Sequence, residues 1–494
     1  MTTTSSSLAG RPVAAEPART SSLRRLWSPE LGVAFAAFAA LCVAVLTRST
    51  QLLEPDDYAY RASIVALTHG HVTLTNAEYT ALASRLGQIM QWVQLPSGSW
   101  ISEKNPGYPF LAAPFQWLGI LRAAPLFYGA LGCLGLYAGG RRWLGRWGGT
   151  WAVVLYCASG AALVFAWRAT MPTFTDASLI AAGTGALLWA MLAIDATVRR
   201  RTVVGLLAFL ALEGAVAIRY TNVIVLVVAL VAVALGRRAA RLTWRSLAWW
   251  LGSVGVLAVL LAAFDQHYYG GILQTGYSSG EITFGLSALH PNIEHMPYHL
   301  VRSMPFLLLG LAAAGWIAVR AARSLRGGLD AAVRSTYRRD GAVAAALVAC
   351  WLGIYGLYAA YTWTVGQGGM GNGISVHVIR FYLPALAAVA LLAAWLLTRL
   401  PRVLTAVTLV ALVGLALWSY PGLASGAMPG GGPGGPGGGR PFGTQPNGMQ
   451  GGRPPLGTPP SGMKPPNGQA PGGTPPSDSQ PPGGAQQQSG TSAF

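Results

Sequence analysis

The stretch LGVAFAAFAALCVAVLTRSTQLLEPDDYAY, residues 31–60, joins a long apolar run to an acidic cluster. The run from Leu31 to Thr47 has no charged residue and approaches the roughly 20 residues with which an α-helix crosses a bilayer. A signal peptide has a similar apolar core, but no small-residue cleavage pattern follows this one. We therefore expect a retained first transmembrane helix, with Glu54, Asp56 and Asp57 just beyond its end.

The composition extends this expectation to the whole chain. Of the 494 residues, 52% are hydrophobic and only 10% are charged, whereas soluble domains carry about 25% charged residues. The formal net charge is +18, from 34 basic and 16 acidic residues. A soluble enzyme and a collagen-like fibre are therefore excluded. The four cysteines lie in apolar runs and offer neither a disulfide framework nor a zinc pattern.

Apolar runs recur along the chain at the length of membrane spans. They lie near residues 31–47, 123–140, 149–167, 176–195, 202–217, 221–236, 247–264, 301–320, 341–361, 379–398 and 402–420. Arginine clusters in alternate connections mark the cytoplasmic side, so these eleven spans leave the N-terminus inside and the C-terminus outside. A further apolar stretch, residues 106–121, would put Arg141 and Arg142 on the wrong side. It is either a re-entrant or interfacial helix or a span that breaks the arginine rule.

The sequence thus predicts an all-α polytopic membrane protein with about 11–12 transmembrane helices. We expect residues 1–30 to form a basic, disordered cytoplasmic lead and residues 31–420 to form the membrane domain, whose first extracytoplasmic loop, 48–105, is long. The part 421–494 forms an extracytoplasmic tail. Because more than half of Ala427–Phe494 is Gly or Pro, we expect this tail to be disordered. Most of the arginines lie in the predicted cytoplasmic connections, where they mark the topology. The high net charge therefore does not indicate nucleic-acid binding.

Glu54, Asp56 and Asp57 are the strongest chemical signal on the predicted outer face. Carboxylates this close repel one another, so at least one should hold a proton more tightly or bind a cation. Such a group suits a general base that takes a proton from an acceptor hydroxyl, or a metal-assisted version of that task. The structural alternative is a solvated cluster that caps the helix expected from Tyr58 to Leu67.

Five short motifs along the layout of the chain resemble one superfamily. They are Asp56-Asp57-Tyr58-Ala59-Tyr60, Lys104-Asn105-Pro106-Gly107-Tyr108, the stretch from Arg168 to Asp176, Arg219-Tyr220-Thr221-Asn222, and Arg380-Phe381-Tyr382-Leu383-Pro384. Together they resemble the GT-C superfamily of integral-membrane glycosyltransferases, which use polyprenyl-phosphate-linked sugars. The most similar branch is the protein O-mannosyltransferase and aminoarabinose-transferase group.

The resemblance implies hexosyl or pentosyl transfer from a polyprenyl-phosphate donor to a lipid, glycan or protein acceptor at the outer face of the plasma membrane. Asp56 is the expected general base, and Asp57 would orient the acceptor or a cation. The donor phosphate would be held by Arg380, Arg219, Lys104 and Arg168, since guanidinium groups bind phosphate oxygens in pairs. Further substrate contacts are expected at Glu54, Tyr60, Asp176, His377 and Tyr382. For Arg380 and Arg302, snorkelling at a helix end is the alternative.

Three residues of the second outer loop, His290, Glu294 and His295, are candidate ligands of a divalent cation such as Zn or Mn. Pro291 and Pro297 are expected to break the helical register that would align them, so interfacial histidines are the favoured interpretation. Two other motif matches, G-x-G-x-x-G at 366–371 and G-x-S-x-G at 276–280, lack the strand context that their chemistry needs. Both are expected to let outer loops fold tightly over a groove.

Two other functions remain open from the sequence. A transporter or lipid flippase would place ionisable residues at mid-membrane, where Asp195 and Glu213 are the nearest acids. A scaffold whose Gly/Pro-rich tail recruits cell-envelope partners would need no catalytic acid and could coexist with transfer.

Overall fold

The computed structural model describes residues 28–48, 55–87, 89–277, 283–325, 329–365 and 376–426. The side chains of His295, Val376, His377 and residues 424–426 lie outside this description. So do the predicted disordered segments before residue 28 and after residue 426, together with Glu54 and the motif at 366–371. Those predictions stay untested.

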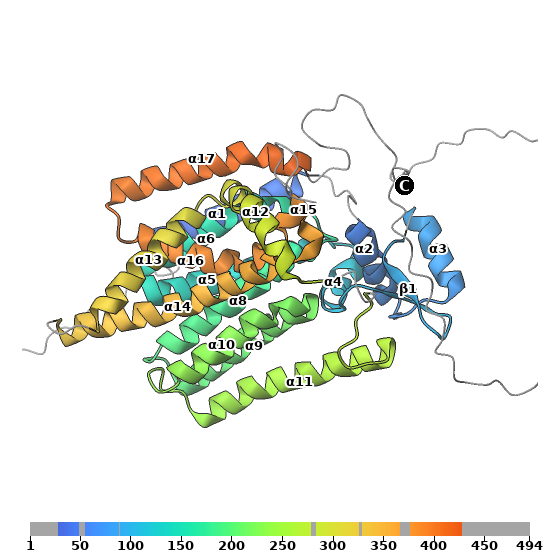
Figure 1. The fold of residues 1–494 in the computed structure, drawn as a ribbon, viewed down its shortest axis with the longest axis horizontal. Helices are drawn as coiled ribbons and strands as arrows, with labels where there is room; N and C mark the ends of the chain where they lie inside the picture. The colour runs from blue at the N-terminus through green and yellow to red at the C-terminus, as the bar shows by residue number, and fades with distance from the viewer. Residues whose placement is uncertain are drawn as a thin grey trace, which may run out of the picture. The chain divides into compact units, whose positions relative to one another are not determined.

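Helices make up nearly all of the regular structure in the described residues (Figure 1). They are α1 Pro29–Leu46, α2 Pro55–Thr68, α3 Asn76–Leu86, α4 Gly107–Trp117, α5 Ala123–Leu144, α6 Arg146–Cys157, α7 Gly160–Ala166, α8 Thr173–Leu192, α9 Val198–Ile218, α10 Val223–Gly236, α11 Trp244–Tyr269, α12 Leu289–Ser303, α13 Leu307–Arg323, α14 Ala331–Ala359, α15 Val376–Ile379, α16 Leu386–Leu397 and α17 Arg402–Gly426. Single 3₁₀ turns, η2 Tyr220–Asn222 and η5 Leu383–Ala385, precede α10 and α16. The strands β1 Trp92–Gln94 and β2 Trp100–Ser102 form one antiparallel hairpin. The predicted all-α polytopic class is confirmed.

Six of the described helices, α1, α8, α9, α11, α14 and α17, are long and apolar enough to cross a membrane. The number rises to eight if α6 with α7, bent by 62°, and the end of α12 with α13, bent by 101°, each form one span. All eleven predicted spans fall on helical segments. The structural count is lower because several of these segments are bent, short or diluted by glycine.

Helix α4 lies within the apolar stretch 106–121, for which the sequence left open whether it crosses the membrane. It has 11 residues, which rise about 16 Å at 1.5 Å per residue. That is roughly half of the hydrocarbon thickness of a bilayer. A straight crossing is therefore excluded for α4, in agreement with the re-entrant or interfacial alternative.

Small residues bring the central helices together. A side chain on Gly135 would meet the Ala182 backbone at 2.6 Å, and one on Gly139 would overlap the backbone of Gly185. Helices α5 and α8 thus pack backbone to backbone, as small-residue stripes allow in membranes. Helix α16 lies among α5, α8, α13 and α14 in Figure 1, and all 12 of its residues are buried.

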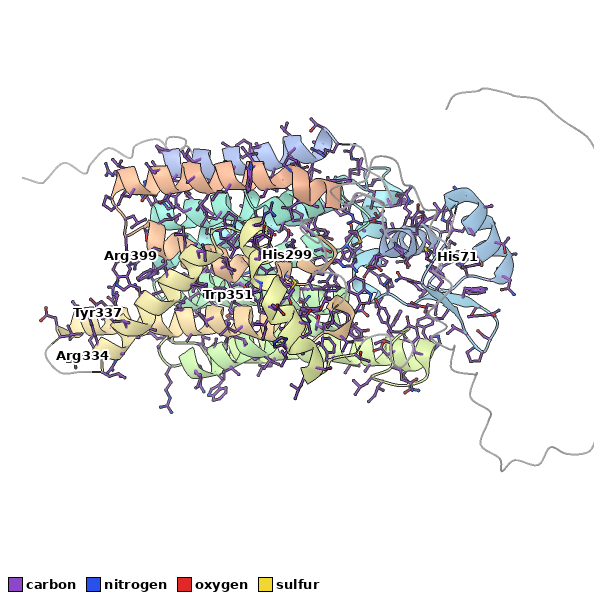
Figure 2. All side chains as sticks on the ribbon, turned by 45° about the horizontal axis from the view of Figure 1, so that its top comes forward. His71, His299, Arg334, Tyr337, Trp351 and Arg399 are labelled. Carbon is purple, nitrogen blue, oxygen red and sulfur yellow. The ribbon has the colours of Figure 1, made fainter. Side chains whose placement is uncertain are left out.

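The two ends of the bundle differ in chemistry. At one end, α2, α3 and the hairpin share an apolar cluster that includes Ala62, Leu82 and Trp92. Figure 2 shows Arg399, Tyr337 and Arg334 at the end away from His71. There Asp340 accepts hydrogen bonds from the indoles of Trp143 and Trp395 at 3.0 and 3.1 Å. The elements that carry the candidate site lie at the first end.

Candidate active site

Asp56 lies in the first turn of α2, and both of its carboxylate oxygens are ion-paired. Lys104 Nζ lies 2.9 Å from Oδ1, and Arg380 Nη1 lies 2.7 Å from Oδ2. Burial alone would raise the pKa of Asp56, but the charges of Arg380 and Lys104 outweigh it and hold the pKa well below its usual range. Asp56 is therefore a carboxylate at neutral pH, with each oxygen held by a cation.

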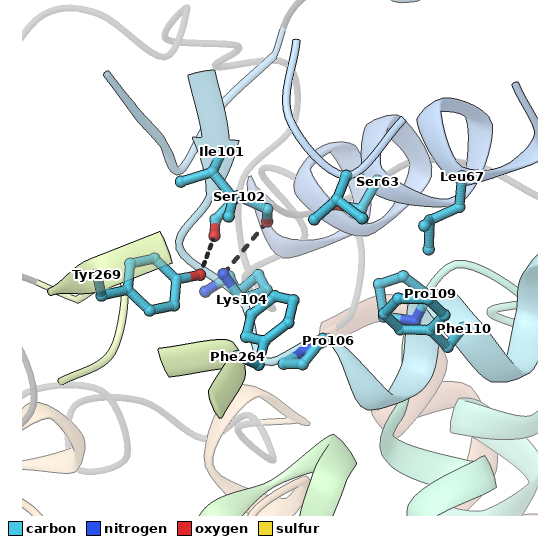
Figure 3. Close-up of a pocket in the computed structure, with 11 residues that line it drawn as sticks. Ser63, Leu67, Ile101, Ser102, Lys104, Pro106, Pro109, Phe110, Phe264 and Tyr269 are labelled. Carbon is cyan, nitrogen blue, oxygen red and sulfur yellow. Dashed lines mark hydrogen bonds between the residues drawn. The ribbon is translucent and has the colours of Figure 1, made fainter. Parts of the chain in front are cut away.

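Local structure aims the Lys104 side chain at Asp56. The Lys104 backbone N–H donates to Ser102 Oγ at 3.2 Å, and the Tyr269 hydroxyl donates to the Ser102 carbonyl at 2.9 Å (Figure 3). Lys104 also lines a small cavity of about 30 Å³, whose other walls include Leu67, Phe110 and Phe264. Asp56 is not part of this cavity's lining. The cavity thus reaches only the lysine side of the ion cluster.

Arg219 supports the position of Arg380. It follows the last residue of α9, and its Nη1 donates to the Arg380 carbonyl at 3.2 Å. Its Nε lies 3.8 Å from Asp176 Oδ2, while Asp176 Oδ1 accepts a hydrogen bond from Asn222 Nδ2 at 2.6 Å. Four of the expected site residues, Asp56, Lys104, Arg219 and Arg380, thus meet in one cluster, with Asp176 buried beneath it.

Asp57 and Arg168 form a separate buried pair. Both side chains are fully inaccessible, the Arg168 guanidinium donates to Asp57 Oδ2, and Thr170 Oγ1 donates to Oδ1 at 2.7 Å. A phosphate could take Arg168 only by breaking its ion pair with a fully buried carboxylate, which is costly. The sequence predicts Asp57 at the acceptor or a cation, and Arg168 at the phosphate. The geometry instead favours a structural tie between α2 and the loop before α8.

The residues that were expected to contact the substrate differ in where the structure places them. Tyr60 is buried with its ring edge against Tyr108, at a centroid distance of 5.7 Å, and burial raises its pKa far above the usual value, so it stays protonated. Tyr382 packs into the core against Tyr355, 4.9 Å between centroids, and its buried hydroxyl has no hydrogen-bond partner among the described residues. Glu54 and the His377 side chain lie outside the described residues.

The metal candidates lie on α12. Helix α12 runs through Pro297, and Pro291 lies in its first turn, where a missing N–H breaks no intrahelical bond. The expected interruption by these two prolines is therefore wrong. His290 and Glu294 are exposed. Among the described residues, no three His, Cys, Asp or Glu side chains are grouped to hold a metal ion, and the His295 side chain is not described. Arg302, on the same helix, donates to the Tyr298 hydroxyl at 2.9 Å.

Tyr277 is a contact of the cluster that sequence reasoning missed. Lys104 Nζ donates to its hydroxyl oxygen at 3.0 Å. The signal was present in the G-x-S-x-G match at 276–280, which we interpreted only as a tightly folded loop. A glycine followed by an aromatic residue, just after a predicted span, could have suggested a side chain that folds back onto the site.

Two solved proteins are similar to this chain, with TM-scores below 0.5. The chain is similar to an oligosaccharyltransferase from Archaeoglobus fulgidus, with 13% identity and a TM-score of 0.48, over 84% of this chain and 57% of that one. It is also similar to ArnT from Cupriavidus metallidurans in the apo state, with 15% identity and a TM-score of 0.44, over 78% and 63%. For ArnT bound to undecaprenyl phosphate, the identity is 15% and the TM-score 0.43, over 81% and 74%.

These two proteins are GT-C glycosyltransferases, the superfamily that the sequence motifs resemble. The chain spans less than two thirds of the length of the oligosaccharyltransferase and of apo ArnT. No protein-family model and no curated protein matches the sequence. At this level of similarity, the function of this chain has to be argued from its own side chains.

Proposed function

We propose that this chain is a membrane glycosyltransferase that moves a hexose or pentose from a polyprenyl-phosphate donor to a lipid, glycan or protein acceptor. Its N-terminus would be cytoplasmic and the ion cluster would face the extracytoplasmic side of the plasma membrane. The observation that carries the proposal is the convergence of Lys104 and Arg380 on Asp56.

The charges of this cluster suit a second anion. Lys104 and Arg380 contribute two positive charges against the single negative charge of Asp56, and all three side chains are less than a fifth exposed. Arg219 adds a third cation beside Arg380. A phosphate oxygen in this setting would accept charge-assisted hydrogen bonds in a poorly screened environment. The cluster therefore supports binding of a lipid-linked phosphate.

The same geometry suggests how Asp56 becomes a base. With both oxygens ion-paired, Asp56 binds a proton weakly. A donor phosphate that takes over Lys104 and Arg380 would free one carboxylate oxygen and raise its proton affinity. Asp56 would then accept the proton of the acceptor hydroxyl, whose oxygen attacks the anomeric carbon. The bond between that carbon and the phosphate oxygen breaks, and the lipid phosphate leaves with the electron pair, held by the two cations. Inversion at the sugar is the expected outcome.

A divalent cation stays a possible addition, and the described residues offer no dedicated site for it. The transporter alternative gains little support from Glu213. Its Oε1 accepts a hydrogen bond from Ser253 at 2.7 Å between α9 and α11. Such a bond joins membrane helices without any transported solute.

Transfer assays test the proposal. Membranes that contain wild type, Asp56→Asn or Lys104→Met would be supplied with radiolabelled polyprenyl-phosphate sugars and envelope acceptors. We expect transfer to fall at least 100-fold in both variants, within the range seen when one acid–base group is removed. Asp195→Asn is the matched control, because Asp195 is an exposed partner of Arg142 on another helix connection. Equal transfer by wild type and Asp56→Asn would contradict the proposal.

A further inference from the structure

The geometry points to Tyr277 as a positioning residue that fixes the direction of the Lys104 ammonium group, and so fixes where the donor phosphate binds. This inference rests on the proposed function, because it concerns how that same site holds its phosphate. It concerns a residue outside all five motifs of the superfamily resemblance.

The first observation is the pair of oxygens around Lys104. Its Nζ lies 2.9 Å from Asp56 Oδ1 and 3.0 Å from the Tyr277 hydroxyl, and it is 4.8 Å from the centroid of the Tyr277 ring. An ammonium group has three N–H donors. Once two of them are directed at fixed oxygens, the direction of the third is fixed as well. Lys104 is 6% exposed, and among the described residues its Nζ is bonded only to Asp56 and Tyr277, so the third N–H can serve a ligand that enters the cluster.

The second observation is the path of the chain after α11. Gly270 ends this helix with φ +82°, a conformation that suits glycine. The end of α11 and the loop after it contact the three successive residues 102–104: Tyr269 donates to the Ser102 carbonyl, Gly276 lies against the Glu103 backbone, and Tyr277 accepts a hydrogen bond from Lys104. The loop is thus held beside the lysine by three consecutive contacts.

Gly276 is what lets the loop come this close. A Cβ atom there would lie 3.0 Å from both the carbonyl carbon and the oxygen of Glu103, and closer still to its Cα. All three are backbone atoms of the residue next to Lys104, so they cannot move aside independently. Any larger residue at 276 would push the Tyr277 hydroxyl away from Lys104.

The hydroxyl of Tyr277 can also donate a hydrogen bond of its own. Burial raises the pKa of Tyr277 far above its usual value, so the phenol keeps its proton. Because the oxygen accepts from Lys104, the O–H proton points away from the ammonium group. It can donate to a phosphate oxygen beside the one that Lys104 holds. A phenylalanine would fill the same space but provide neither interaction, which separates positioning from packing.

Because the chain has few lysines, phosphate binding at Lys104 can be followed through the signal of a single carbon atom. Lys104 and Lys464 are its only lysines, so Lys464→Arg leaves a single ¹³Cε-lysine signal in the full-length protein in detergent. Farnesyl phosphate, a short polyprenyl monophosphate, would be titrated against this signal, with farnesol as the phosphate-free control. We expect the wild-type signal to shift with farnesyl phosphate and not with farnesol.

Tyr277→Phe should then need about tenfold more farnesyl phosphate for half of the shift, the effect of one lost charge-assisted hydrogen bond. Tyr268→Phe is the matched control, because Tyr268 is a phenol of the same helix end that packs on Phe264. It should titrate like wild type. Gly276→Ala should weaken the titration at least as much as Tyr277→Phe, and thermal melting of each variant would show that it is folded.

The outcomes separate the two proposals. If Tyr277→Phe titrates like wild type while the Lys104 signal of Arg380→Met no longer shifts with farnesyl phosphate, the positioning role is overturned and the phosphate site stands. If wild type shows no preference for farnesyl phosphate over farnesol, the proposed function fails and this inference fails with it.

Discussion

Arg380 Nη1 lies 2.7 Å from Asp56 Oδ2, although 324 positions separate the two residues in the sequence. The guanidinium also lies near two aromatic rings: its Cζ is 4.9 Å from the ring centroid of Phe381 and 5.4 Å from that of Trp363. The contact therefore joins the start of α2 to the turn before α16. It places a fixed positive charge against the one acidic residue in the cluster that is partly exposed.

Arg380→Lys tests whether the positive charge at this position has to come from a guanidinium group. A lysine keeps the charge but lacks the planar pair of donors that binds an oxyanion bidentately. We expect the KM for the lipid-linked donor to rise about tenfold or more, and kcat to fall less. Steady-state transfer kinetics measure this split. An unchanged donor KM would show that Arg380 acts only as the partner of Asp56.

The ion pairs of Asp56 also predict how stability depends on pH. Its pKa in the folded protein lies below the unfolded value of about 3.9. Pairing therefore contributes stability that is fully present above about pH 3.9 and is lost as the pH falls toward the folded pKa. Below about pH 4, the free energy of unfolding of wild type should drop more steeply than that of Asp56→Asn.

Chemical denaturation in detergent at a series of pH values measures this difference. At neutral pH, Asp56→Asn should be the less stable protein, because Lys104 and Arg380 then lose the carboxylate with which both are paired. Other acids titrate in both proteins, so only the difference between the two curves reports on Asp56. Parallel curves would mean that the pairing contributes no net stability.

The buried Asp57–Arg168 pair should affect stability more than chemistry. Asp57→Ala removes the carboxylate with which the buried Arg168 is paired, and we expect it to lower the free energy of unfolding by about 3–5 kcal/mol. Asp57→Ala combined with Arg168→Met should cost less than the sum of the single changes, because the double variant removes both charges of the pair and each single variant removes only one. A double-mutant cycle of unfolding measurements provides this comparison. Additive losses would contradict the assignment of Asp57 to a structural tie.

The sequence predicted the positions of the helices well because hydropathy is a local property. Each of the eleven predicted spans falls on a helical segment. Partner choice among outer arginines could not be predicted in the same way. Arg168 and Arg380 have equivalent positions at predicted span ends, and only tertiary packing decides that the first pairs with Asp57 and the second with Asp56. Tyr277 was missed for a related reason, since its role depends on the path of a loop and on the fit of Gly276.

At the other end of the bundle, Asp340 provides a test that is independent of the site. It accepts hydrogen bonds from Trp143 and Trp395 and lies 3.2 Å from Arg399 Nη2, so Asp340→Ala leaves two buried indole donors without their acceptor and removes the ion pair of Arg399. We expect a loss of about 1–3 kcal/mol in the free energy of unfolding. Transfer per folded molecule should not change. Loss of activity in fully folded Asp340→Ala would show that this end takes part in function.

Because α5 and α8 approach so closely, even one added methyl group at their contact should lower the stability of the protein. A methyl group on Gly139 would overlap the Gly185 backbone, whereas the space around Gly252 on α11 is open within 4 Å. Both changes improve helix propensity by a similar amount, so Gly252→Ala is a matched control for Gly139→Ala. We expect Gly139→Ala to lower the melting temperature, because α5 and α8 must separate to admit the methyl group. Gly252→Ala should leave it unchanged or raise it slightly. If the two variants melted alike, close packing of α5 on α8 would not be what holds these helices together.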